Sequence, residues 1–279
     1  MNYLDVAIAA AKKAGKIHKR YFRSNIRIET KSSPFDLLTV ADKEAEKAVV
    51  SMIKKSFPGH NFLAEEQSYE KTGSEYTWII DPLDGTNNFA CGLPIFCASV
   101  ALMRSGEVEV GAIYDVMRNE LFCAQKGRGA FLNGKPISVS AADTLEKSLL
   151  ITGFYYSRGE EMIQTLETIK RFFLTRIMGL RRLGAAALDL CYVACGRASG
   201  FWEFELNPWD FAAGKLLIEE AGGKITGKGG EKIFPVDKSF VVASNGRIHE
   251  QMLAVLNEKG TPKRVSYPGR AVIFGMKKK

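Results

Sequence analysis

Apolar residues recur at helical spacing at the start of the chain. Such spacing places them on one face of a helix, so an amphipathic helix is predicted there. Its inward face would hold Leu4, Ala7, Ala11, Ala14, Ile17, His18 and Tyr21. A second helix is predicted to begin after Thr39, a good N-cap residue, and to end before Phe57-Pro58-Gly59. Its inward face would hold Ala41, Ala45, Ala48, Met52 and Ile53.

Shorter apolar runs after residue 60 indicate strands. Trp78-Ile79-Ile80 predicts a buried strand that ends at Asp81, and residues 62–64 predict a shorter strand upstream. Asn133-Gly134 is typical of a hairpin turn. Three further strands are predicted at residues 95–103, 108–114 and 120–126.

From Ser148 onward, strand and helix patterns alternate. The predicted strands are residues 149–152, 176–178, 198–203 and 240–243. The predicted helices are residues 160–173, 185–195, a segment after Pro208, and 248–256. The chain is therefore predicted to form two fused α/β subdomains, residues 1–141 and 142–262, followed by a basic tail at 263–279.

Composition changes this picture mainly at the C-terminus. The chain has 279 residues, 46% of them apolar, and a formal net charge of +8. Residues 259–279 hold seven bases and no acid, whereas the preceding residues hold 32 bases and 31 acids. A basic tail is usually solvated, but it could bind RNA or an acidic partner. No run reaches the about 18 apolar residues of a membrane helix, and no signal-peptide core is present, so a cytoplasmic protein without membrane contact is expected.

The sequence Asp81-Pro82-Leu83-Asp84-Gly85-Thr86-Asn87-Asn88-Phe89 places two carboxylates and a hydroxyl directly after a predicted strand. Side chains alternate along a strand, so two acids three residues apart would point to opposite faces unless the chain bends. Pro82 and Gly85 can bend it and aim both carboxylates at one point. Converging carboxylates repel unless a cation lies between them, and such oxygen ligands suit Mg²⁺. The alternative is an ordinary Asp-Pro-Gly turn without a metal.

Two further segments add acids to this set. Glu65-Glu66 follows the short upstream strand, and Asp210 lies in the first turn of the helix that starts at Asn207-Pro208. With them, the chain resembles the inositol monophosphatase family, the Mg²⁺-dependent, lithium-sensitive phosphatases related to fructose-1,6-bisphosphatase. The resemblance rests on five blocks in order: Lys31-Ser32-Ser33-Pro34, Thr39-Val40-Ala41-Asp42, Glu65-Glu66, the Asp81 motif with Gly92-Leu93-Pro94, and Trp209-Asp210 with Glu220-Ala221-Gly222-Gly223.

The resemblance implies a fold, an assembly and a set of metal ligands. The fold would be a layered α-β-α-β-α sandwich of the α/β class, and the protein would be a homodimer with two or three Mg²⁺ per site. Glu65, Asp81 and the backbone carbonyl of Leu83 would bind the first ion. Asp81, Asp84 and Asp210 would bind the second, and Glu65 with waters a weaker third. Asp210 also suits a helix cap, and the two roles are compatible.

The resemblance also implies a reaction, the release of inorganic phosphate from inositol monophosphate by a metal-activated water. Thr86 and Asp42 would orient that water and accept its proton, and Lys31 would match a loop lysine near the third ion. The backbone N–H groups of Gly85 and Thr86 would bind phosphate at a helix start. Contacts to ring hydroxyls would come from Gly184, Ala185, Ala186, Glu203 and Asp84.

Three alternatives stay open. A second phosphate could be bound by a basic side chain, which would indicate a dual inositol monophosphate and fructose 1,6-bisphosphate phosphatase. A 3'(2'),5'-bisphosphate nucleotidase is more distant, because the motif ends in Thr-Asn-Asn-Phe rather than Thr-Lys-Gly-Phe. The chain could also be an RNA- or protein-binding module that uses the basic tail. The candidates for a second phosphate are Arg158, Lys170, Arg171, Arg176, Arg181 and Arg182.

Overall fold

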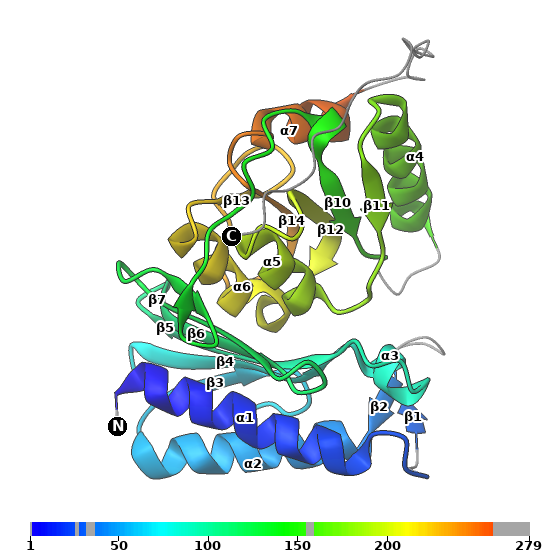
Figure 1. Cartoon of the computed structure of the whole chain (residues 1–279). Coiled ribbons are helices and arrows are strands. Elements are labelled where there is room, and N and C mark those ends of the chain that lie inside the picture. The colour runs from blue at the N-terminus through cyan, green and yellow to red at the C-terminus, as the bar shows by residue number, and fades with distance from the viewer. Residues whose placement is uncertain (1, 26–27, 32–36, 155–158, 259–279) are drawn as a thin grey trace.

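Two helices cover the outer face of a seven-stranded sheet in the computed structural model, which describes residues 2–25, 28–31, 37–154 and 159–258. They are α1 (Tyr3–Tyr21) and α2 (Val40–Ser56), and both predicted helices are thereby confirmed (Figure 1). The Thr39 side chain accepts a hydrogen bond from Ala41 N, and Asp42 completes a capping box. Residues 32–36, Arg158 and the basic tail lie outside the described residues.

The seven-stranded sheet has the order β3-β4-β5-β6-β7-β8-β9. Only β3 and β4 are parallel, and the other neighbours are antiparallel. The Asn133-Gly134 turn joins β8 and β9 with positive φ at both residues, which confirms the predicted hairpin. The strands are β3 (Asn61–Ala64), β4 (Tyr76–Asp84), β5 (Cys97–Arg104), β6 (Glu107–Asp115), β7 (Glu120–Gln125), β8 (Ala130–Leu132) and β9 (Lys135–Pro136). A separate ribbon of β1 (Ile28–Thr30) and β2 (Leu37–Thr39) was not predicted.

The end of β4 differs from the prediction. The strand does not stop at Asp81 but continues to Asp84, and Asp81 pairs with Ser99 while Asp84 pairs with Cys97. Three steps along β4 therefore match two along β5, which is a β-bulge. The extra residue cancels one alternation, so both acids point to the same face of the sheet. A bulge, and not a turn after the strand, brings the two carboxylates together.

The second sheet has five strands in the order β11-β10-β12-β14-β13. Strand β10 runs parallel to β11 and β12, and β14 runs antiparallel to its neighbours. The strand predicted at residues 176–178 is wrong, because Arg176 has a φ of 63° and the chain is still turning out of α4 there. The strands are β10 (Leu149–Thr152), β11 (Gly179–Arg181), β12 (Gly200–Leu206), β13 (Lys224–Thr226), which was not predicted, and β14 (Ser239–Ser244).

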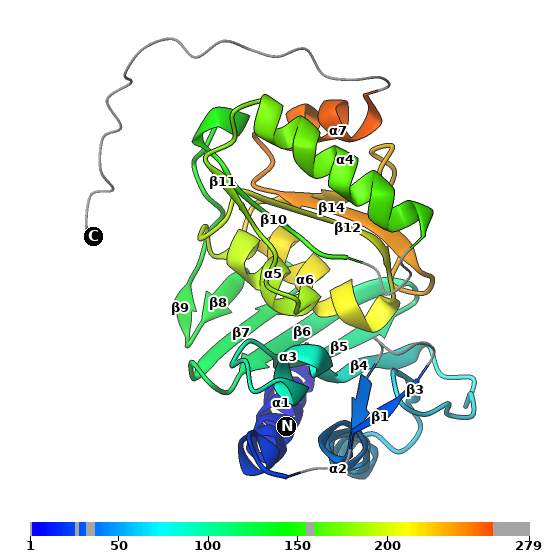
Figure 2. The same ribbon diagram turned by 90° about the vertical axis from the view of Figure 1, so that its right-hand side faces the viewer.

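Helices α5 (Ala186–Ala194) and α6 (Pro208–Glu220) fill the space between the two sheets, while α4 (Glu160–Leu174) and α7 (His249–Asn257) cover the outer face of the second sheet (Figure 2). Trp78 and Ile80 pack against α1 and α2, whereas Ile79 packs toward α5 and α6. The predicted α-β-α-β-α sandwich is confirmed. The subdomain boundary near residue 141 stays a prediction. No helix among the described residues is long and apolar enough to cross a bilayer.

Candidate active site

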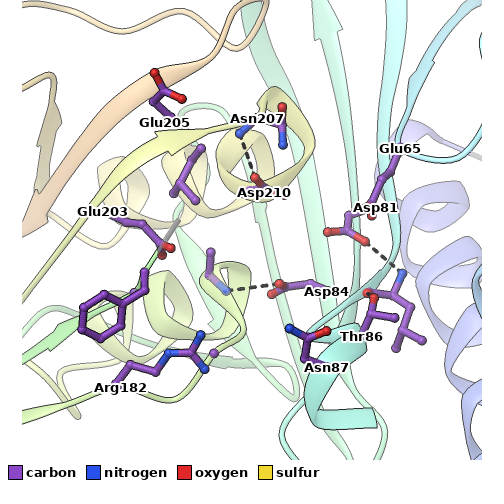
Figure 3. Close-up of a pocket in the computed structure, with 17 residues that line it drawn as sticks. Glu65, Asp81, Asp84, Thr86, Asn87, Arg182, Glu203, Glu205, Asn207 and Asp210 are labelled. Carbon is purple, nitrogen blue, oxygen red and sulfur yellow. Dashed lines mark hydrogen bonds between the residues drawn. The ribbon is translucent and has the colours of Figure 1, made fainter. Parts of the chain in front are cut away.

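A cleft opens where the end of β4 and the short helix α3 (Thr86–Ala90) meet the first turns of α5 and α6 and the end of β12 (Figure 3). Asp81, Asp84 and Asp210 point into its centre, while Glu203 and Arg182 lie on the other side. The lining residues are Glu65, Asp81, Leu83, Asp84, Gly85, Thr86, Asn87, Gly153, Phe154, Arg182, Gly184, Ala186, Glu203, Glu205, Leu206, Asn207 and Asp210. The fold therefore brings all four predicted acidic ligands into one cleft.

Crowding of these acids changes their protonation. Burial, followed by the charges of Glu65, Asp84 and Asp210, raises the pKa of Asp81 well above its usual range. The pKa of Asp210 is likewise raised well above its usual range by burial and then by Glu65 and Asp84. Burial raises the pKa of Asp84 to about 6. Such a cluster favours either bound protons or a bound cation.

Asp81 and Asp84 already accept hydrogen bonds from the backbone. The Asp81 carboxylate accepts from Leu83 N at 2.9 Å. The Asp84 carboxylate accepts from Ala186 N at 3.2 Å and from Ala187 N at 2.8 Å, at the start of α5. A carboxylate at a helix N-terminus is favoured by the helix dipole. These bonds tie the end of β4 to α5, in the other half of the chain.

Asp210 is held by its own helix. Its Oδ2 atom accepts from Asn207 N at 2.7 Å, and the Asn207 side chain caps the backbone at Asp210 in return. Pro208 occupies the first helical turn, where its missing N–H costs nothing. The predicted capping role of Asp210 is confirmed, and the remaining lone pairs of its carboxylate stay available to a ligand.

Lys31 lies beside the first glutamate of the Glu65-Glu66 pair. Its Nζ atom is 2.8 Å from Glu65 Oε1 and 2.6 Å from Glu66 Oε1. Burial, followed by the charge of Glu65, raises the pKa of Glu66 to about 8. Lys31 does not line the cleft, but it neutralises the acids next to it.

Thr86 and Asp42 form the pair that the sequence predicted. Thr86 Oγ1 lies 3.0 Å from Asp42 Oδ1 and 2.9 Å from the Leu83 carbonyl oxygen. Asp42 is fully buried behind Thr86, and its other oxygen accepts from Thr39 N at 2.7 Å. Burial raises the pKa of Asp42 to about 6. Gly85, with a φ of 90°, begins α3, and a Cβ there would lie 2.9 Å from the Ile95 carbonyl oxygen, so only glycine fits.

The other side of the cleft is lined by Gly184, Ala186, Arg182 and Glu203, whereas Ala185 is buried and does not line it. Burial raises the pKa of Glu203 to about 8, although the Arg182 charge opposes this shift. A neutral Glu203 can donate as well as accept a hydrogen bond. This end of the cleft therefore offers polar groups of mixed character to the part of a substrate beyond its phosphate.

Asn88 links the two sides. Its Nδ2 atom donates to the Ile95 carbonyl oxygen at 2.8 Å, and to those of Leu183 at 2.8 Å and Gly184 at 3.3 Å. Gly184 has a φ of 84°, and its carbonyl precedes α5. A side chain within the Asp81 motif thus fixes the loop opposite it.

Several lining residues were not predicted as site residues. Gly153 is the clearest case, because a Cβ there would lie 1.9 Å from Glu203 Oε2. Strand β10 pairs with β12 in parallel, with Thr152 beside Trp202, and this places Gly153 next to Glu203. Parallel pairing leaves no local signal in a sequence. The other lining residues in this group are Asn87, Phe154, Arg182 (predicted only as a phosphate contact), Glu205, Leu206 and Asn207.

The donor set fits Mg²⁺ in its chemistry. All five predicted ligands are oxygens, four of them acidic, as hard divalent cations prefer. Within the described part of the chain, no three such acids already converge on a point that could hold an ion. The carboxylates instead accept hydrogen bonds from Leu83, α5 and Asn207, and each oxygen keeps a further lone pair for a cation.

The fold and the acidic cleft define a class of layered α/β proteins, and sequence comparison identifies the family. The model of the inositol monophosphatase family matches residues 2–261, so the chain belongs to this family. The predicted family is thereby confirmed. Membership of this family supports the prediction that the protein is a phosphatase.

Individual relatives carry two kinds of name. The Nus factor SuhB of Escherichia coli strain K12 is 40% identical over 258 residues, which cover 92% of this chain and 96% of that protein. An IMPase from Thermotoga maritima is 38% identical with a TM-score of 0.84, and the match covers 92% of this chain and 97% of that one. An IMPase/NADP phosphatase complexed with Mg²⁺ and phosphate is 29% identical with a TM-score of 0.79, over 90% and 93% of the two chains. That complex supports Mg²⁺ dependence in the family.

Proposed function

We propose that the protein is a Mg²⁺-dependent phosphate monoester hydrolase that releases inorganic phosphate from inositol monophosphate. One observation supports this most: the four acids Glu65, Asp81, Asp84 and Asp210 line the same cleft as Thr86, which is hydrogen-bonded to Asp42. The family membership and the relative with bound Mg²⁺ and phosphate agree with it.

The residues that would hold two or three Mg²⁺ are the four acids of the cleft and Leu83. Glu65, Asp81 and the Leu83 carbonyl would hold one ion, and Asp81, Asp84 and Asp210 a second, with Glu65 as a partner of a weaker third. When bound, Mg²⁺ neutralises charge on phosphate oxygens and lowers the pKa of water. Lithium inhibition is expected on the same ligand set.

The protein's own residues would supply proton transfer and orientation. Thr86 Oγ1 can accept a proton from the attacking water as it passes its own to Asp42, which lies 3.0 Å away. Asp42 suits this step because burial raises its pKa to about 6. Lys31 would limit the charge of Glu65 and Glu66 in the absence of an ion.

The phosphate and the polyol would bind at different places. Gly85 and Thr86 line the cleft at the start of α3, and their backbone N–H groups would bind phosphate oxygens. Gly184, Ala186 and Glu203 would contact ring hydroxyls, with Asp84 between the two sets. Ala185 would contribute through its backbone only, because its side chain is buried.

One assay tests the proposal. Phosphate release should be measured from inositol 1-phosphate, fructose 1,6-bisphosphate and 3'-phosphoadenosine 5'-phosphate, each with Mg²⁺ and with a chelator. We expect turnover of inositol 1-phosphate that requires Mg²⁺. Turnover of the nucleotide alone would favour the bisphosphate nucleotidase, and no turnover of any ester would favour a binding module.

A second candidate is the dual phosphatase that also uses fructose 1,6-bisphosphate. Arg182 favours it, because its guanidinium lines the cleft, whereas Arg181 is exposed and donates to the Leu180 carbonyl oxygen. The two adjacent arginines form a matched pair. Arg182→Ala should weaken fructose 1,6-bisphosphate turnover by about 10-fold and Arg181→Ala should leave it unchanged. Equal effects of both changes would exclude Arg182 as a phosphate contact.

The remaining expectations are proposals as well. A homodimer and a cytoplasmic location follow from the resemblance and the composition. Because the curated relatives at 40% identity are named Nus factor SuhB, a Nus-factor role is a further proposal for this chain. Such a role would use a surface of the protein that contacts another macromolecule, and not the cleft.

A further inference from the structure

The outer faces of α1 and α2 are strongly basic. All lysine and arginine side chains of the two helices are exposed, whereas two of the four acids, Asp42 and Glu46, are fully buried. The exposed bases are Lys12, Lys13, Lys16, Lys19 and Arg20 on α1, and Lys43, Lys47, Lys54 and Lys55 on α2. The near-neutral charge of residues 1–258 therefore hides an uneven distribution, with acids in the cleft and bases on this layer.

Helix geometry places these bases in stripes. Successive residues rotate by about 100°, so Lys12, Lys16 and Lys19 lie within roughly 60° of one another on α1. Lys47 and Lys54 lie within roughly 20° of each other on α2 by the same count. Both stripes lie opposite the buried alanines that face the sheet, and both helices lie side by side in Figure 1. The result is a basic stripe on each of two adjacent helices of one layer.

Few acids neutralise this surface. Glu44 pairs with Arg20, and Glu29 pairs with Lys43. Asp5 is used in the N-terminal capping box of α1. Seven lysines form no ion pair with any described residue: Lys12, Lys13, Lys16, Lys19, Lys47, Lys54 and Lys55. Seven unpaired cations on two adjacent helices create a positive potential that attracts polyanions.

The surface also has a shallow groove beside α2. It is lined by three of these lysines together with Val50, Ser51, Gln67 and Tyr69. Lys54 Nζ lies 5.2 Å from the centre of the Tyr69 ring, so the aromatic ring orients this cation. Hydroxyl and amide groups next to oriented cations are typical contacts to phosphate oxygens.

We infer that this basic surface of α1 and α2 binds the phosphate backbone of a nucleic acid strand. On α1 the lysines of the stripe repeat every three or four residues, about 5 to 6 Å along the helix, which suits a ligand with a regular series of charges. A membrane is a poorer fit, because Val40 is the one large apolar side chain exposed on these two helices, and surface-bound helices bury an apolar face. The bound strand would make no base-specific contact with the lysine stripes.

The surface is separate from the cleft. It lies on the opposite face of the seven-stranded sheet from α5 and α6, whose first turns form the cleft (Figure 1). No residue of α1 or α2 is among the residues that line the cleft. Nucleic-acid binding and phosphate release can therefore be lost independently, and the inference does not rest on the proposed function.

Full-length protein should be titrated with a fluorescent 20-nucleotide RNA strand over a range of salt concentrations. The quadruple variant Lys13→Gln, Lys16→Gln, Lys47→Gln, Lys55→Gln should bind at least about 10-fold more weakly than the parent protein at low salt. The slope of log affinity against log salt should fall by about 0.7 for each phosphate that the variant no longer neutralises. Activity on inositol 1-phosphate should not change.

A control variant separates the surface from overall charge. Lys126, Lys147, Lys170 and Lys232 each pair with an acid elsewhere, and their change to Gln removes the same number of cations. This control should retain binding and the full salt slope. Equal losses in both variants, or no binding by the parent protein at low salt, would overturn the inference. So would binding to phosphatidylserine vesicles without binding to RNA.

Discussion

At one end of the cleft, Asp81, Asp84 and Thr86 come from a single short motif, whereas at the other end Gly153, Arg182 and Glu203 come from three separate segments. The first end is formed locally by the β4 bulge and the start of α3. The second depends on strand pairing and on loops. The difference suggests that chemistry is concentrated at the first end and substrate choice at the second.

Substitutions at the two ends of the cleft should therefore affect activity in different ways. A change at the motif should lower turnover of every phosphate ester by a similar factor. A change at the far end should alter the ratio between substrates that have ring hydroxyls and small esters that lack them.

The largest effect is expected for Asp81→Asn, because Asp81 is proposed to bind two ions. Loss of a residue that only supports a metal ligand typically lowers activity by about 10- to 100-fold. Turnover of Asp81→Asn should fall by more than this factor. The far-ultraviolet circular dichroism should be unchanged, and calorimetry should detect weaker Mg²⁺ binding. Full activity would remove Asp81 from the proposed ligand set.

Thr86→Ala should lower kcat by about 10²-fold on inositol 1-phosphate and on p-nitrophenyl phosphate alike, with a smaller change in KM. The hydroxyl that lies 3.0 Å from Asp42 is then missing. Thr86→Ser keeps that hydroxyl and should restore most of the turnover. An unchanged kcat in the alanine variant would move proton transfer to another residue.

Asn88→Asp tests the link between the two ends. The change replaces an N–H donor with an acceptor that faces the Leu183 and Gly184 carbonyl oxygens, so the loop at Gly184 should shift. KM for inositol 1-phosphate should rise about 10-fold relative to KM for p-nitrophenyl phosphate.

A matched control for this change exists outside the cleft. Asn257 Nδ2 also donates to two backbone carbonyl oxygens, those of Lys228 and Leu253. Asn257→Asp should lower the Tm without changing the ratio of the two KM values. The same ratio in both variants would show that Asn88 supports the fold and not substrate choice.

The smallest effects concern two buried histidines, one in each half. Burial lowers the pKa of His18 to about 4. Burial, followed by the charge of Lys224, lowers the pKa of His249 to about 4 as well. In the unfolded chain each histidine becomes protonated as the pH falls below about 6.5, whereas in the folded chain it stays neutral until about pH 4. Each histidine should therefore lower the free energy of unfolding by about 2 kcal/mol at pH 5 relative to pH 8. His249→Gln should remove that share of the pH dependence in urea unfolding.

His18 should differ from His249 in one further respect. Its Nε2 atom lies 2.7 Å from the Pro82 carbonyl oxygen, inside the β4 bulge, whereas His249 contacts the hydroxyls of Thr226 and Ser244. His18→Leu should therefore raise the Mg²⁺ concentration needed for half-maximal activity, and His249→Leu should not. An identical Mg²⁺ requirement in both variants would show that His18 does not influence the proposed Mg²⁺ ligands at the end of β4.

Local signals predicted much of the fold. The helices α1, α2, α4, α5, α6 and α7 follow from apolar periodicity, and their starts follow from short capping patterns such as Thr39 with Asp42 and Asn207 with Asp210. The strand at residues 176–178 was misplaced, and β13 was missed, because short strands at a sheet edge have weak patterns. Pairing partners, which the sequence does not encode locally, decide where such strands form.

The sequence by itself determined which chemical groups meet at the motif end of the cleft, since Asp81, Asp84 and Thr86 lie close together in any fold that keeps the motif intact. Tertiary structure decided the rest. The bulge against β5 turned the two aspartates to one face, the parallel pairing of β10 with β12 placed Gly153 under Glu203, and the loop before α5 put Arg182 in the cleft and Arg181 outside it. These choices depend on contacts between residues far apart in the chain, and such contacts leave no periodic or local pattern to read.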